Sequence, residues 1–250
     1  MTLPRAYHEI KKLSREQLKL FVAENIKHLG EDEALAVIEN PFVTPMLLMA
    51  IAQNPRLAGF YAVRVRLVAH RQTPQAQSAK LIHYLYWFDL VRLSVEVTVP
   101  ATVRRAIDTL LAIRVDKLTL GERIASARRC SHALVKIFLR DHDPRVFLTV
   151  LSNQRVREDD ILAVIASRET TPEMLQMIAD DQKWSYRYAV RKGLVLNPAT
   201  PRSAAATQLR FLTPRDRRLI HSNPSTSTYL RRCIERLQPK DFSAHVEQIE

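Results

Sequence analysis

Apolar residues recur at intervals of three and four through most of the chain, in short runs separated by polar turns. One run follows Pro45 (Met46, Leu47, Met49, Ala50), and a similar run follows Pro172 (Met174, Leu175, Met177, Ile178). This spacing places apolar side chains on one face of a helix. We expect α-helices near residues 14–28, 31–39, 45–53, 56–69, 74–86, 88–97, 101–114, 120–129, 131–140, 144–152, 158–167, 172–180, 185–195, 201–209, 214–221 and 226–237. Only LSVEVTV at 93–99 alternates as a strand would, and we assign it to the end of a helix.

Proline, usually beside threonine, divides these runs. The proline-containing segments are NPFVTP at 40–45, QTP at 72–74, TVP at 98–100, TTP at 170–172, NPATP at 197–201, LTP at 212–214 and NPSTST at 223–228. Threonine can accept hydrogen bonds from the free N–H groups of a helix start, and proline fits the first helical position. These segments therefore predict helix starts. Pro45 to Pro74 and Pro172 to Pro201 are each 29 residues apart, and Pro74 to Pro100 is 26, which indicates stacked helical pairs. The repeat is irregular, since Pro201 and Pro214 are only 13 residues apart, and one helix there would stand for half a unit.

One part of the chain resembles a known repeat class. TPEMLQMIADD, WSYRYAV and NPATP, within 172–201, are similar to the leucine-rich repeat variant and the wider HEAT-like pattern, in which a TPxxLxxLA helix precedes WxVRxxVA and an Asn-Pro turn. DPRVFLTVLSN at 143–153 is similar to the second helix of that unit, and the resemblance is best over 131–237. It implies an all-α fold, a right-handed α-solenoid of short HEAT-like helical pairs.

The resemblance also suggests an organisation for the chain. We expect an N-terminal helical cap at 1–39, the solenoid at 40–238 and a C-terminal tail at 239–250. Leucine-rich repeat variant proteins can carry a cysteine-rich iron–sulfur segment, but this chain has only Cys130 and Cys233, without ligand spacing, so we expect no cofactor. The sparse cysteines, with no secretory signal or membrane span, predict a soluble protein of the reducing cytoplasm.

The charge of the chain is large and uneven. The formal net charge is +12, with only four glycines, which argues against glycine-rich phosphate-binding loops. Residues 182–240 hold 13 Lys or Arg against two acids, whereas residues 158–181 hold seven acids against one Arg. The candidate binding residues are Lys183, Arg187, Tyr188, Arg191, Lys192, Arg215, Arg217, Arg218, Arg231 and Arg232. Solvated helix faces without a function are the alternative interpretation of these charges.

The aromatic residues near 184–194 have mixed expected roles. A helix that begins near Ser185 would bury the stripe Tyr186, Ala189, Val190, Gly193 and Leu194. Trp184 would pack against the preceding repeat. Tyr188 would face the other way, at a ligand surface.

These features predict a non-enzymatic binding or scaffold protein that holds an acidic protein partner through its basic C-terminal third. The alternative is a nucleic-acid-binding HEAT-like protein, which includes a DNA-glycosylase-like repair protein. The cluster Tyr84, Tyr86, Trp87 and Phe88 beside Asp89 is the feature that raises the repair hypothesis.

No residues predict catalysis or a metal site. His142 lies between Asp141 and Asp143, but no spacing signals a further ligand, and Asp143 suits the N-cap of a helix after Pro144. We therefore expect no enzyme activity.

Overall fold

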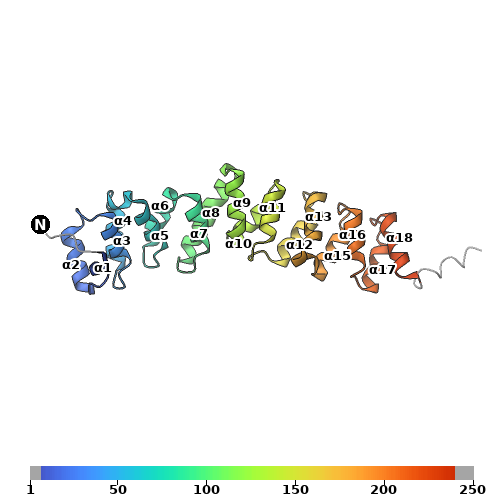
Figure 1. Cartoon of the computed structure of the whole chain (residues 1–250), viewed down its shortest axis with the longest axis horizontal. Coiled ribbons are helices and arrows are strands. Elements are labelled where there is room, and N and C mark those ends of the chain that lie inside the picture. The colour runs from blue at the N-terminus through green and yellow to red at the C-terminus, as the bar shows by residue number, and fades with distance from the viewer. Residues whose placement is uncertain (1–6, 240–250) are drawn as a thin grey trace, which may run out of the picture. The chain divides into compact units, whose positions relative to one another are not determined.

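The computed structural model describes residues 7–239, and within that range every regular element is a helix. The first helices are α1 (Tyr7–Ile10), α2 (Arg15–Asn25), α3 (Glu31–Ile38), α4 (Pro45–Gln53), α5 (Tyr61–Ala69), α6 (Gln75–Leu81), α7 (Trp87–Val95), α8 (Ala101–Arg114) and α9 (Leu120–Arg129) (Figure 1). They continue with α10 (His132–Phe138), α11 (Pro144–Leu151), α12 (Glu158–Ala166), α13 (Pro172–Asp180), α14 (Gln182–Ser185), α15 (Tyr188–Leu196), α16 (Arg202–Leu209), α17 (Pro214–Ser222) and α18 (Thr228–Leu237). The all-α prediction is confirmed. The described helices include none long and apolar enough to cross a lipid bilayer.

The predicted helix starts hold where threonine occupies the N-cap. Thr44, Thr171 and Thr213 accept hydrogen bonds from the N–H of the third helical residue at 3.4, 3.3 and 3.2 Å, and proline follows each of them. At Pro74, Pro100 and Pro201 the proline itself is the N-cap. The helices after Pro74 and Pro201 therefore begin one residue later than expected, whereas α8 begins at Ala101 as expected. The segment 93–99 ends α7 at Val95, and the rest of it is a turn.

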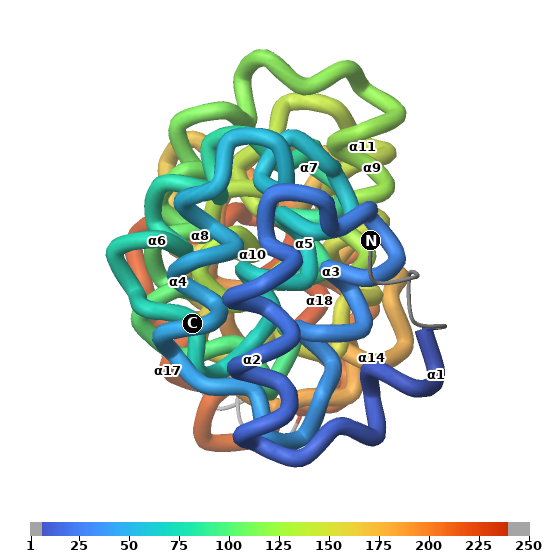
Figure 2. Tube along the Cα trace, turned by 90° about the vertical axis from the view of Figure 1, so that its left-hand side faces the viewer, coloured from blue at the N-terminus to red at the C-terminus, as the bar shows by residue number. Residues whose placement is uncertain are grey.

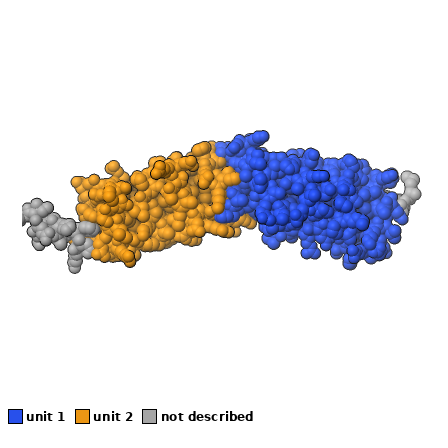
Figure 3. All heavy atoms as spheres, turned by 180° about the vertical axis from the view of Figure 1, so that it is seen from behind, with its two compact units in different colours: residues 1–134 blue, residues 135–250 orange. Residues whose placement is uncertain are grey.

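The contacts divide the chain into two compact units, residues 1–134 and 135–250 (Figure 3). In the first unit, the chain runs back and forth from helix to helix (Figure 2), and helices two apart in sequence pack together: α1 on α3, α3 on α5, and α6 on α8. In the second unit, α12 packs on α15, α13 on α16, and α16 on α18. The expected boundaries at 40 and 239 stay predictions, and residues 240–250 of the expected tail lie outside the described part.

The two units contain matching sequence blocks, 31–107 and 158–234, related by a shift of 127 residues without insertion or deletion. EDEALAVI at 31–38 corresponds to EDDILAVI at 158–165, YAVRVRLV at 61–68 to YAVRKGLV at 188–195, and VRRAI at 103–107 to LRRCI at 230–234. The helix pairings correspond as well, since α3–α5, α5–α6 and α6–α8 match α12–α15, α15–α16 and α16–α18. Each block can therefore serve as an internal reference for the other.

Asparagine side chains join the ends of helices that lie two or three apart in the chain. The Nδ2 atoms of Asn40, Asn54 and Asn197 donate to the carbonyl oxygens of Ile10, Ile26 and Ile165 at 2.8, 3.3 and 2.5 Å. The Oδ1 atom of each accepts an N–H two residues ahead, which shapes the Asn-Pro turn. These links span 28 to 32 residues, close to the repeat length expected from the proline spacing.

Candidate binding surface

Trp184 in α14 is fully buried and is the centre of the first group of candidate residues. Its indole Nε1 donates to the carbonyl oxygen of Leu151 at 3.1 Å, as expected for an aromatic that packs against the preceding helices. Lys183 and Arg187 lie over the ring, with the charged groups 4.3 and 5.2 Å from its centroid. Arg187 also forms an ion pair with Glu158 at 2.7 Å. Both cations therefore stabilise the fold locally.

Partial desolvation changes the chemistry of the Lys183 ammonium group, although the residue is exposed. Desolvation lowers the pKa of its ammonium group below the ordinary lysine value, opposed by the carboxylate of Asp181. The ammonium group lies 3.4 Å from the carbonyl oxygen of Asn153. A group held in this way is a weaker point of contact for an anion than a fully hydrated lysine.

Arg191 is also held by its own unit. Its Nε donates to the carbonyl oxygen of Ser185, and its guanidinium lies 4.0 Å from the ring centroid of Phe211 and 5.5 Å from that of Tyr186. Arg64, its counterpart in the first block, donates to the carbonyl oxygen of Gly59 in a similar way. An arginine at this position therefore donates to a nearby backbone carbonyl oxygen in both blocks.

Tyr188 and Lys192 both contact the carboxylate of Asp216. The Tyr188 hydroxyl donates to the Asp216 carboxylate and accepts the backbone N–H of Thr213 at 3.1 Å, while the Lys192 ammonium lies 3.0 Å from the carboxylate. The hydrogen bond from Tyr188 and that from Lys192 lower the pKa of Asp216. Tyr188 is 41% exposed, but its hydroxyl forms hydrogen bonds that join α15 to α17.

The predicted core stripe of this region was wrong at its first two positions. Tyr186 is 75% exposed and Ala189 is exposed, whereas Val190, Leu194 and Val195 are buried. The helix was expected to begin near Ser185, but a short helix and a turn precede Tyr188, which changes the register of the buried face. Gly193 does belong to that face, since a Cβ there would lie 3.3 Å from Ile165.

The remaining candidates lie on α17 and α18, which pack against each other. Arg215, Arg218 and Arg232 are exposed and form no hydrogen bond or ion pair with any other described residue. Arg217 is half-buried, and its Nε has no hydrogen-bond partner. Arg231 donates to the carbonyl oxygens of Asn223 and Pro224 at 3.0 and 3.4 Å, so it closes the turn before α18.

The sequence interpretation missed other members of this surface. Exposed cations without a partner in the described part also include Arg202, Arg210 and Arg236. Leu219 on α17 is 56% exposed and Tyr229 on α18 is 44% exposed. Leu219 lies four residues after Arg215, and Arg232 three after Tyr229, so helical spacing alone could have found these pairs.

The aromatic cluster of the first unit forms a second exposed patch. Tyr84, Tyr86 and Phe88 are exposed, and the rings of Tyr86 and Tyr61 lie 4.7 Å apart. The Asp89 carboxylate, however, accepts the Tyr61 hydroxyl at 2.5 Å and pairs with Arg92 at 3.1 Å. Asp89 therefore corresponds to Asp216, and its carboxylate makes contacts within the fold.

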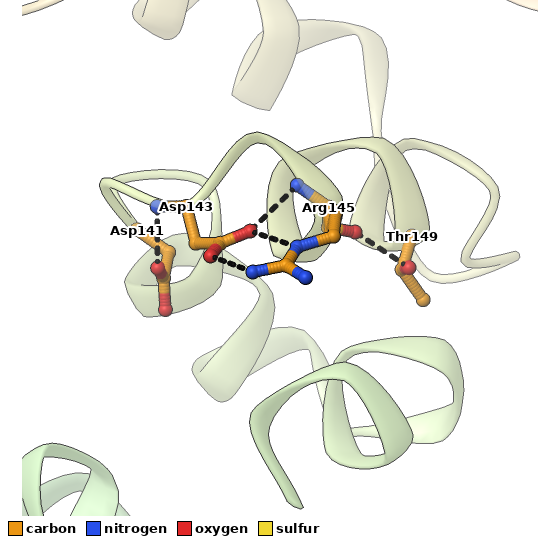
Figure 4. Close-up of polar contacts among 4 residues, drawn as sticks. All are labelled: Asp141, Asp143, Arg145 and Thr149. Atoms are coloured by element: carbon orange, nitrogen blue, oxygen red, sulfur yellow. Dashed lines mark hydrogen bonds and ion pairs between the residues drawn. The ribbon is translucent and has the colours of Figure 1, made fainter. Parts of the chain in front are cut away.

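The turn around His142 is a helix cap. Asp143 accepts the N–H of Arg145 at 2.9 Å and pairs with its guanidinium at 2.9 Å, as Figure 4 shows. Asp141 accepts the N–H of Asp143 at 2.9 Å. The predicted N-cap is confirmed. Within residues 7–239, no group of three or more His, Cys, Asp or Glu side chains is arranged to hold a metal ion.

Comparison of the chain with protein-family models, with curated proteins and with solved structures found no match.

Proposed function

We propose that the protein is a non-enzymatic binding protein that holds an acidic protein segment on the surface of α16, α17 and α18. The observation that carries this proposal is the contrast between two groups of cations. Lys183, Arg187, Arg191, Lys192 and Arg231 already have partners in their own unit. Arg215, Arg218 and Arg232 are exposed without one, so their charge is available to a ligand.

Exposed apolar side chains on the same helices as these arginines favour a protein partner. Leu219 and Tyr229 are exposed at helical spacing from Arg215 and Arg232, and a protein interface combines apolar anchors with polar groups around them. The arginines supply electrostatic attraction and bidentate contacts to carboxylates. A nucleic acid remains the second candidate, because Tyr229 three residues before Arg232 could stack on a base.

We infer further that the helical pairs form a right-handed α-solenoid of the HEAT-like kind. The packing of helices two or three apart in each unit and the asparagine links of 28 to 32 residues support this arrangement. In such an array each pair buries its apolar face on its neighbours, which leaves helix surfaces free for a partner.

The test measures anisotropy of a fluorescein-labelled Glu/Leu peptide and of a labelled 20-mer DNA, single-stranded and duplex, over a range of salt concentrations. We expect the peptide to bind and the double variant Arg218→Glu/Arg232→Glu to weaken binding at least tenfold. Arg105→Glu is the matched control, because Arg105 is the exposed counterpart of Arg232 in the first block.

DNA affinity greater than peptide affinity, with a steep salt dependence, would instead support the nucleic-acid function. Binding of neither probe at low salt would overturn both proposals, as would equal losses in the control variant and the double variant.

A further inference from the structure

The second unit contains a groove of about 840 Å³, within the range of ligand-binding clefts. Its floor includes Leu139, Val164 and Met174, side chains that are almost fully buried. Its rim is polar and comes from α12, from the turn after it and from the first turn of α13. An apolar floor inside a polar rim is the usual arrangement of a site that takes an apolar side chain.

The duplication explains why the groove is open. In the first block Asn40 donates to the carbonyl oxygens of Ile10 and Leu13 at 2.8 and 3.1 Å, and α1 packs directly on α3. Its counterpart in the second block is Ser167, which lines the groove and whose hydroxyl accepts the N–H of Glu169. The shorter side chain has no amide to make the same double link, and the space stays open.

The rim is mainly acidic although the protein is basic. Asp159, Glu169 and Glu173 line the groove, are exposed, and form no ion pair with any other described residue. In the first block the counterparts of Glu169 and Glu173 are Phe42 and Met46, so these two acids belong to the second block alone. Lys136 and Arg140 also line the groove and provide fewer charges of the other sign.

We propose that this groove is a second binding site, for a peptide segment of a partner protein that carries a large apolar side chain flanked by Lys or Arg. The apolar side chain would lie on Leu139, Val164 and Met174. Its basic neighbours would pair with Asp159, Glu169 and Glu173, whose carboxylates are available. This site requires a ligand of the opposite charge to the one proposed for α16–α18, so the two proposals can fail separately.

The experiment uses the full chain and two fluorescein-labelled nine-residue peptides, one of alternating Arg and Leu and one with Glu in place of Arg. Anisotropy titrations should show that the Arg/Leu peptide binds. Asp159→Lys combined with Glu173→Lys should weaken that binding at least tenfold, whereas Asp32→Lys, at the counterpart of Asp159 in the first block, should leave it unchanged.

A second pair of variants tests the space itself. Ala163 is exposed and lines the groove, whereas Ala166 is exposed on the same helix outside it. Ala163→Trp should fill the groove and abolish peptide binding, and Ala166→Trp should not. Circular dichroism and thermal unfolding of each variant show whether it remains folded.

Three results would overturn the proposal. The first is binding of the Glu/Leu peptide as tightly as the Arg/Leu peptide. The second is absence of Arg/Leu binding up to millimolar peptide at low salt. The third is self-association of the protein that Ala163→Trp abolishes, since it would assign the groove to a second copy of the chain.

Discussion

Tyr188 and Asp216 stand in the same relationship as Tyr61 and Asp89, one pair in each block. In both, a tyrosine at the first position of a helix donates its hydroxyl to an aspartate at the third position of the helix two further along the chain. The same hydroxyl accepts the N-cap N–H of that helix, from Thr213 or Tyr86. The tyrosine thus satisfies a free N–H group at the helix start while it joins two helices.

Tyr188→Phe should lower the free energy of unfolding by about 1 kcal/mol, because it removes the hydrogen bond to the Asp216 carboxylate and the acceptor of the Thr213 N–H at a partly exposed site. Urea unfolding followed by circular dichroism measures this loss. Tyr186→Phe is the control, because Tyr186 is 75% exposed and its hydroxyl has no partner among the described residues. The free energy of unfolding of this variant should equal that of the natural chain. Equal losses in both variants would contradict a structural role for the Tyr188 hydroxyl.

The lowered pKa of Asp216 predicts a pH dependence. Hydrogen bonds from Tyr188 and Lys192 favour the carboxylate in the folded state, so its stabilisation is fully present above the unfolded pKa, near 3.8. It is lost as the pH falls through the lower folded value. Asp216→Asn should therefore be less stable than the natural chain at pH 7, and the gap should close below pH 3.8. A gap that stayed constant with pH would refute this assignment.

Gly193→Ala should stabilise the protein by roughly 0.5 to 1 kcal/mol, because glycine is a poor helix former. A Cβ at this position would lie 3.3 Å from Ile165 Cγ2, a close contact that requires a small shift. The first block shows that such a helix pair accepts a side chain here, since Arg66 is the counterpart of Gly193 and Ile38 is the counterpart of Ile165. Thermal unfolding measures the change, and a lower melting temperature would mean that Ile165 cannot move.

Trp184→Leu introduces the residue that the first block has at this position, Leu57, which is also fully buried. We expect a loss of about 2 to 4 kcal/mol, since the change leaves a cavity and removes the hydrogen bond to Leu151. Lys183 and Arg187 also lose their aromatic partner. Urea unfolding measures the loss, and Trp87→Leu, at a half-buried tryptophan, should cost less.

The sequence predicted the helices well because their starts are local. Thr213 and Pro214 lie in adjacent positions, and the cap needs only the residues that follow. The ion pairs could not be predicted in the same way, because they join residues far apart in the sequence. Lys192 pairs with Asp216, which lies 24 residues further along the chain, and a count of cations over 182–240 does not show which of them are paired. The repeated YAVR at 61 and 188 was a signal for the duplication, and it would have linked Tyr188 to a structural role through Tyr61.

The range of the cross-helix links has a consequence for synthesis of the chain. The bonds of Asn40, Asn197 and Trp184 reach back 30, 32 and 33 residues, to partners already made. A growing chain can therefore complete each link soon after the later residue leaves the ribosome, without waiting for distant segments. We expect ribosome-bound fragments that end after successive helices to gain protease resistance step by step, in the order in which they are translated.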